Sequence, residues 1–107
     1  MPRCVVTGCT RPLWWRGRRL ARQVTDLDAH LPALEQLRAT ARRRADDCNE
    51  RELRWTIGIG RGYRWHMHEA AHGDRFARTS LPTQAQLDDW CVEARQTATR
   101  LDGAPQR

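Results

Sequence analysis

One short stretch of the chain has residue types that could carry out catalysis. Residues 68–72 read His-Glu-Ala-Ala-His, the HExxH spacing of zinc metallopeptidases, with Glu69 in the position of the general base. Glu93 lies 21 residues beyond His72 and could supply a third zinc ligand beside His68 and His72. This chemistry requires both histidines on one face of a helix.

The pattern around this stretch predicts a strand rather than a helix. Apolar and basic residues alternate from Tyr63 to Glu69, and His72-Gly73 is typical of a turn. Residues four apart on a strand are about 13 Å apart, too far for one zinc ion. The sequence therefore favours a protein without enzymatic activity, and a minimal HExxH peptidase is the least favoured alternative.

The four cysteines offer a second possible metal site. Cys4 and Cys9 have the C-x4-C spacing of half a structural zinc site, which His30, Cys48, Cys91 or a strand histidine could complete. A second close pair of cysteines is missing, and Cys48 and Cys91 each fall on an apolar helical stripe. We therefore expect reduced thiols, with a structural zinc through Cys4 and Cys9 as the alternative.

The length and the net charge of the chain restrict the classes of function that it can have. The 107 residues suffice for one small domain, and all 19 basic residues are arginines, which gives a net charge of +6 against 13 acids. No apolar run approaches the roughly 20 residues of a membrane span, and the N-terminus lacks the apolar stretch of a secretory signal. We expect a cytoplasmic protein of a GC-rich bacterium or its phage that binds duplex DNA or another polyanion.

The N-terminal half is predicted to be helical after an irregular arm at residues 1–17. Between residues 18 and 50, apolar positions follow a heptad seam from Leu20 to Cys48, with Pro32 expected to break or kink the helix. The seam could form a homodimer through Leu20–Cys48 or pack on its own domain. The interruption by Pro32 favours packing within the chain.

The period then changes from helical to alternating. Leu53–Ile59, Tyr63–Glu69 and Arg75–Thr79 are predicted to form three strands, with a turn at Gly60-Arg61-Gly62. Thr83 and Gln86 then form a capping box that starts a helix with Leu87, Trp90, Cys91 and Ala94 on one face. The predicted fold is α+β: an N-terminal helical segment, a three-stranded antiparallel sheet and a C-terminal helix packed on one face, with residues 51–101 as the strand-strand-strand-helix domain and 102–107 as a frayed tail.

The face of this sheet that the helix leaves open would be basic. A two-stranded ribbon fits the major groove of DNA, and arginine contacts both phosphates and guanine edges. The predicted nucleic-acid contacts are Arg54, Arg64, His66, Arg75 and Arg78.

Residues 63–95 also permit a comparison with known families. A Trp-bearing strand, a turn with Gly, a basic strand, a Pro-Thr helix start and a Trp within the helix would lie at Trp65, Gly73, Arg75–Arg78, Leu81–Ala85 and Trp90. This order resembles the arm-type N-terminal DNA-binding domain of phage tyrosine integrases. The resemblance implies that a three-stranded sheet enters the major groove through Arg64, His66, Arg75 and Arg78.

The same stretch is similar to the YegP-like family of small strand-strand-strand-helix domains. That similarity implies a protein-interaction module without nucleic acid. The chain departs from both families at His72, where Asn or Asp is usual before Gly. It departs again at Leu81, where an aromatic residue is usual, and at Gln84, where a basic one is. No recombinase catalytic domain follows within the sequence, so integration chemistry is not implied.

Overall fold

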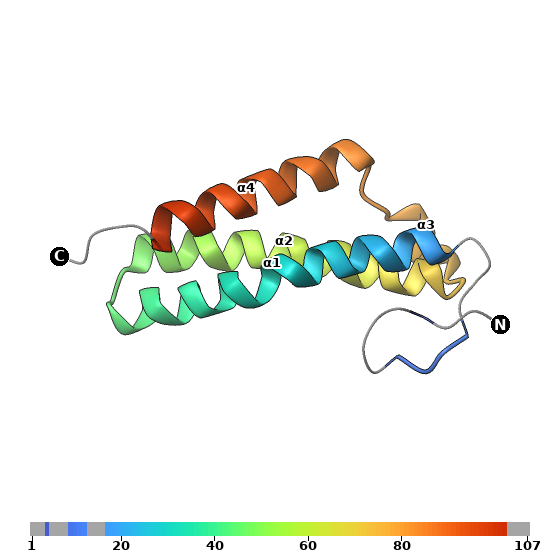
Figure 1. Cartoon of the computed structure of the whole chain (residues 1–107), viewed down its shortest axis with the longest axis horizontal. Helices are drawn as coiled ribbons and strands as arrows, with labels where there is room; N and C mark the ends of the chain where they lie inside the picture. Colours follow the sequence, from blue (N-terminus) through green and yellow to red (C-terminus); the bar gives the residue numbers. More distant parts are fainter. Residues whose placement is uncertain (1–3, 5–8, 13–16, 103–107) are drawn as a thin grey trace.

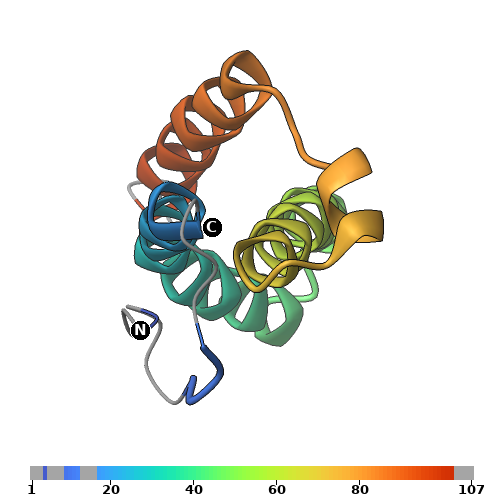
Figure 2. The ribbon, with the colours of Figure 1, turned by 90° about the vertical axis from the view of Figure 1, so that its right-hand side faces the viewer.

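The computed structural model describes residues 4, 9–12 and 17–102, and this part of the chain is built from helices. α1 spans Gly17–Arg43, α2 spans Asp47–Ala71, α3 spans Arg75–Thr79 and α4 spans Gln84–Asp102. α1 and α2 form a long antiparallel hairpin, and α4 packs along both of them (Figure 1). The end-on view of Figure 2 shows α3 beside α2, on the side away from α1.

The predicted α+β fold is wrong, because the described residues contain no strand. Both Leu53–Ile59 and Tyr63–Glu69 lie in α2, and so does the supposed turn between them, while Arg75–Thr79 forms α3. The buried residues of α2 recur at helical spacing: Leu53, Thr56, Ile57, Gly60, Met67, Ala70 and Ala71. Trp55, which would share one face of the predicted strand with Leu53 and Ile57, is 73% exposed.

Gly60 permits a close contact between α2 and α4 and does not form the predicted turn. A Cβ atom at Gly60 would lie 2.8 and 2.9 Å from two ring carbons of Trp90, so only glycine lets α4 approach α2 this closely. The Trp90 indole also donates a hydrogen bond of 2.9 Å to the Thr56 carbonyl. The glycine-rich part of α2 is therefore held helical by a tertiary contact.

The heptad seam of α1 packs against other helices of the same chain. Its central residues, Val24, Leu27, Leu31, Leu34 and Ala41, are buried in the core shared with α2 and α4. α1 continues through Pro32, so the expected break does not occur, and the apolar side chains buried before and after the proline hold both halves in place. Packing on its own domain, the favoured alternative for the seam, is confirmed.

The helix ends follow local capping rules. The Thr83 hydroxyl accepts a hydrogen bond of 3.1 Å from the Gln86 backbone N–H, and the Gln86 side chain accepts one of 2.8 Å from the Thr83 N–H. The predicted capping box and C-terminal helix are thus confirmed. α2 ends at Ala71 with His72 as its C-cap, followed by Gly73 at a φ of 92°, which favours glycine.

The predicted terminal segments and the predicted absence of a membrane span can be compared with the described part of the chain. Most of the predicted arm, and residues 103–107 of the predicted tail, lie outside the described residues. Among the helices of the described part, none is both long and apolar enough to cross a bilayer.

Candidate metal centre

The C-terminal end of α2 brings His68 and His72 together. Residues four apart share a helix face, and the two imidazole rings lie with their centroids 4.8 Å apart at 84°. Their Nε2 atoms are 3.3 Å apart. The separation of about 13 Å expected for a strand is therefore wrong, because this segment is helical.

Two cysteines from the N-terminal segment complete a cluster around these histidines. Ligand atoms of Cys4, Cys9, His68 and His72 all lie within 4.8 Å of one another, and each residue is half-buried. The Cys9 Sγ is 3.3 Å from the His72 Nε2, across 63 positions of sequence. In Figure 1 the coloured residues of the N-terminal segment lie at the end of the molecule where α2 ends and α1 begins.

The distances fit one tetrahedral zinc ion. Zinc bonds of 2.0–2.1 Å to nitrogen and 2.3 Å to sulfur imply separations of about 3.3 Å between two nitrogens, about 3.5 Å between nitrogen and sulfur, and about 3.8 Å between two sulfurs. The His68–His72 and Cys9–His72 separations, both 3.3 Å, match the first value and come within a few tenths of an ångström of the second. The remaining ligand pairs exceed the tetrahedral values by no more than about 1.3 Å.

A hydrogen bond from outside the cluster orients one ligand. The His72 Nδ1 lies 2.8 Å from the Pro12 carbonyl, which can only accept, so Nδ1 carries the proton. The Nε2 lone pair of His72 is then free to face the cluster. Metal-bound histidines in proteins are commonly oriented in this way.

The charges beside the cluster are already paired. Arg11 donates two hydrogen bonds, of 3.0 and 2.9 Å, to the two carboxylate oxygens of Glu69, and this contact lowers the pKa of Glu69. Burial, followed by repulsion from His72 and Arg11, lowers the pKa of His68 and favours the neutral imidazole that metals bind. Glu69 thus lies beside the cluster as the partner of an arginine.

This arrangement differs from a catalytic zinc site. Catalytic zinc has three protein ligands and keeps a fourth position for water, whereas four protein ligands make a closed structural site. Glu93, the predicted third ligand, is an exposed residue of α4 outside the cluster. Cys4 and Cys9 join the histidines instead, and the bidentate contact with Arg11 occupies the carboxylate proposed as general base.

The other candidate partners for Cys4 and Cys9 lie elsewhere. His30 stacks edge-on against Trp90 with ring centroids 6.1 Å apart. Cys48 is exposed at the start of α2, and burial raises the pKa of the half-buried Cys91 on α4. Of the partners considered from the sequence, only the histidines at the end of α2 meet the pair.

The sheet that was predicted to align the nucleic-acid contacts is absent from the described residues. Arg54 is exposed on α2, and Arg75 and Arg78 are exposed on α3. Arg64 is half-buried in an ion pair with Asp28, at 2.5 Å. The half-buried His66 packs its ring against Trp65 and buries an Nδ1 that has no hydrogen-bond partner among the described residues.

No family model matches the chain, and neither a curated protein nor a solved structure is similar to it. The resemblance of residues 63–95 to integrase arm domains and to the YegP-like family stays a prediction. The strands which that resemblance implies at Trp65 and at Arg75–Arg78 lie in helices α2 and α3.

Proposed function

We propose that this protein binds one zinc ion through Cys4, Cys9, His68 and His72, and that the ion has a structural role. The observation that supports the proposal is the convergence of four ligand atoms within 4.8 Å from two distant parts of the chain. Two thiolates and two imidazoles can coordinate one ion tetrahedrally. Such a ligand set favours zinc over metals that prefer oxygen ligands or planar geometry.

The ion would fasten the N-terminal segment to the end of the α1–α2 hairpin. It joins Cys9 to His72, 63 residues away, beside the contacts that Arg11 and Pro12 make with the same turn. Because an unfolded chain lacks the assembled site, the free energy of metal binding adds to the free energy of folding. Thiol ligands need a reducing compartment, which is in keeping with the predicted cytoplasmic location.

The proposal is tested by metal stoichiometry on the reduced, full-length chain. We expect one zinc per wild-type chain, and loss of tight binding in Cys4→Ser/Cys9→Ser and in His72→Ala. The matched control is Cys48→Ser/Cys91→Ser, which removes the same number of thiols outside the cluster and should keep one zinc. Equal zinc content in the two double variants, or no zinc in the folded wild type, would overturn the proposal.

We propose nucleic-acid binding as a second function, because the arginines are only partly neutralised within the fold. The net charge is +6, and nine exposed arginines form no ion pair with a residue that the structure describes: Arg18, Arg19, Arg22, Arg43, Arg44, Arg51, Arg54, Arg75 and Arg95. Arginine in such positions is suited to phosphate contacts. The polyanion proposed from the sequence thus remains the proposed partner, bound by helices instead of a sheet.

This second function is tested by binding of labelled single-stranded and duplex DNA at two salt concentrations. Affinity should fall steeply as salt rises, since phosphate contacts release counterions. Absence of binding at low salt would rule the function out. A homodimer through Leu20–Cys48 has no support, because the central residues of that seam are buried within one chain.

A further inference from the structure

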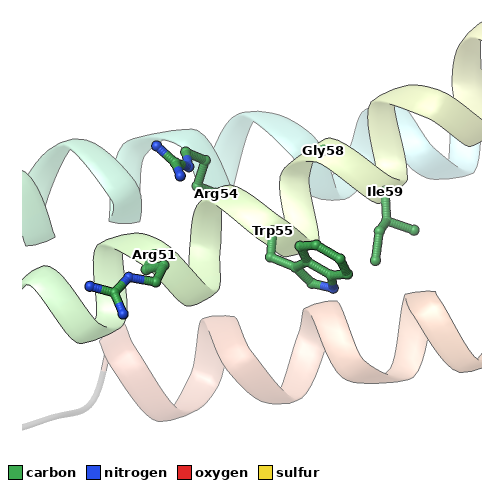
Figure 3. A pocket seen from close by; sticks show the side chains of 5 residues that line it. All are labelled: Arg51, Arg54, Trp55, Gly58 and Ile59. Carbon is green, nitrogen blue, oxygen red and sulfur yellow. The ribbon is translucent and has the colours of Figure 1, made fainter.

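The outer face of α2 carries an exposed tryptophan beside a hollow. Trp55 is 73% exposed, the highest exposure among the large hydrophobic residues of the described part. With Arg51, Arg54, Gly58 and Ile59 it lines an open hollow of about 360 Å³. Figure 3 shows Trp55 and Ile59 projecting from the same side of α2, with Arg51 one turn before Trp55.

The helix spacing explains the hollow. Trp55 and Ile59 are four residues apart and form its two apolar walls. Gly58 contributes no side chain, and a Cβ atom placed there would have nothing within 4 Å. The indole face is therefore accessible to a flat ligand instead of being covered by a neighbour.

The charge at this hollow is positive and uncompensated. Arg51 and Arg54 form no ion pair with any described residue, and no described lining residue is acidic. The nearest acids in sequence have other partners, because Glu50 pairs with Arg38 at 2.9 Å and Glu52 pairs with Arg100 at 2.8 Å. An anionic ligand is therefore the chemical complement of this surface.

The other arginines of α2 with described partners are already neutralised. Arg61 pairs with Glu35, and Arg64 pairs with Asp28. The free positive charge on this helix is thus concentrated at Arg51 and Arg54, which both precede Trp55 along α2 and line the hollow with it (Figure 3).

We propose that this hollow binds single-stranded nucleic acid, with one base stacked on Trp55 and the adjoining phosphates held by Arg51 and Arg54. An aromatic face next to guanidinium groups is the arrangement by which proteins bind single strands without sequence preference. A duplex keeps its bases stacked on one another, so an indole on a helix surface can stack only on an unpaired base. This inference rests on the proposed nucleic-acid function and gives it a site and a strand preference.

The experiment measures binding of a fluorescent oligothymidylate to the full-length chain at several salt concentrations. Trp55→Ala should weaken binding by about 5- to 150-fold, as expected for loss of one stacked base. Its matched control is Trp65→Ala, which removes another exposed tryptophan of the same helix and should leave affinity unchanged.

A second pair of variants tests the charges. Arg51→Gln/Arg54→Gln should lower the slope of log affinity against log salt by about 1.4, since each single-strand phosphate contact contributes about 0.7. Arg61→Gln/Arg64→Gln removes the same charge from paired positions and should leave the slope unchanged.

The outcomes separate the site from the function. If neither oligothymidylate nor duplex DNA binds the wild type at low salt, the nucleic-acid function itself fails and this inference fails with it. If DNA binds and Trp55→Ala behaves like Trp65→Ala, the function stands and the assignment to this hollow is wrong. Tighter binding of duplex than of single strand would also overturn the proposed strand preference.

Discussion

Replacing the glycines of α2 with alanine should have opposite effects at neighbouring positions. In Gly60→Ala the new methyl group would overlap the Trp90 ring, which is buried at only 4% exposure. Such overpacking costs about 1–3 kcal/mol. Displacing the indole would also weaken its 2.9 Å hydrogen bond to the Thr56 carbonyl, worth about 1 kcal/mol.

Alanine is also a better helix former than glycine, by about 1 kcal/mol. This gain offsets part of the overlap at Gly60, so we expect a net loss there of about 1–3 kcal/mol. At Gly58 and Gly62 an added methyl group would have nothing within 4 Å, so alanine at either position should stabilise the protein by about 0.5–1 kcal/mol. The pair Gly58→Ala and Gly62→Ala is the matched control.

The assay is thermal unfolding followed by circular dichroism in the far ultraviolet, with urea unfolding as a check on the free energy. A change of 1 kcal/mol shifts Tm by about 4–8 °C in a domain near this size. Gly60→Ala should therefore melt several degrees below wild type, and the two controls a few degrees above it. If Gly62→Ala were destabilised as much as Gly60→Ala, as a glycine turn at residues 60–62 would require, the helical account of residues 53–69 would be refuted.

Three further predictions follow from the metal centre and the cysteines. Removing zinc with a chelator should lower Tm by about 10 °C or more, and adding zinc should restore it. The reason is that an ion present at about 1,000 times its Kd stabilises the folded protein by about 4 kcal/mol. An unchanged Tm would contradict a structural role. Glu69→Gln should keep one zinc per chain, and the wild type should show no zinc-dependent hydrolysis of peptides; hydrolysis abolished by Glu69→Gln would favour the peptidase instead. At mildly alkaline pH iodoacetamide should label Cys48 faster than Cys91, because Cys48 is exposed while burial raises the pKa of Cys91. Mass spectrometry would measure the two labelling rates. Equal rates would contradict this difference between the two thiols.

The elements with strong local signals could be predicted from the sequence. The capping box at Thr83 and Gln86 is a contact between residues three apart, so it identifies the start of α4 without knowledge of the rest of the fold. The seam of α1 likewise shows a helical period that one face must bury.

The strand prediction fails at α2 because its sequence supports two periods at once. Leu53 and Ile57 satisfy both an alternating and a helical pattern, and glycine-rich segments have low intrinsic helix propensity. The deciding interaction is the contact of Trp90 with Gly60, which joins residues 30 positions apart and is not visible in local patterns. Without the strands, the predicted basic sheet face does not exist among the described residues.

Only the two separate pairs of zinc ligands could be predicted from the sequence, because the strand prediction kept them apart. The spacings of Cys4 with Cys9 and of His68 with His72 are both typical of zinc ligands. A strand at residues 63–69 would separate the histidines and leave each pair without its partner. A helix at residues 68–72 makes the two pairs complementary, although the return of the N-terminal segment to α2 is a long-range contact.

X-ray absorption at the zinc edge of the reduced, full-length protein can identify the ligands of the proposed zinc ion. We predict a shell of two sulfur atoms at about 2.3 Å and two nitrogen atoms at about 2.0–2.1 Å, with no bound water. A shell of nitrogen and oxygen atoms without sulfur would contradict the assignment of Cys4 and Cys9 and favour a catalytic site built on His68 and His72.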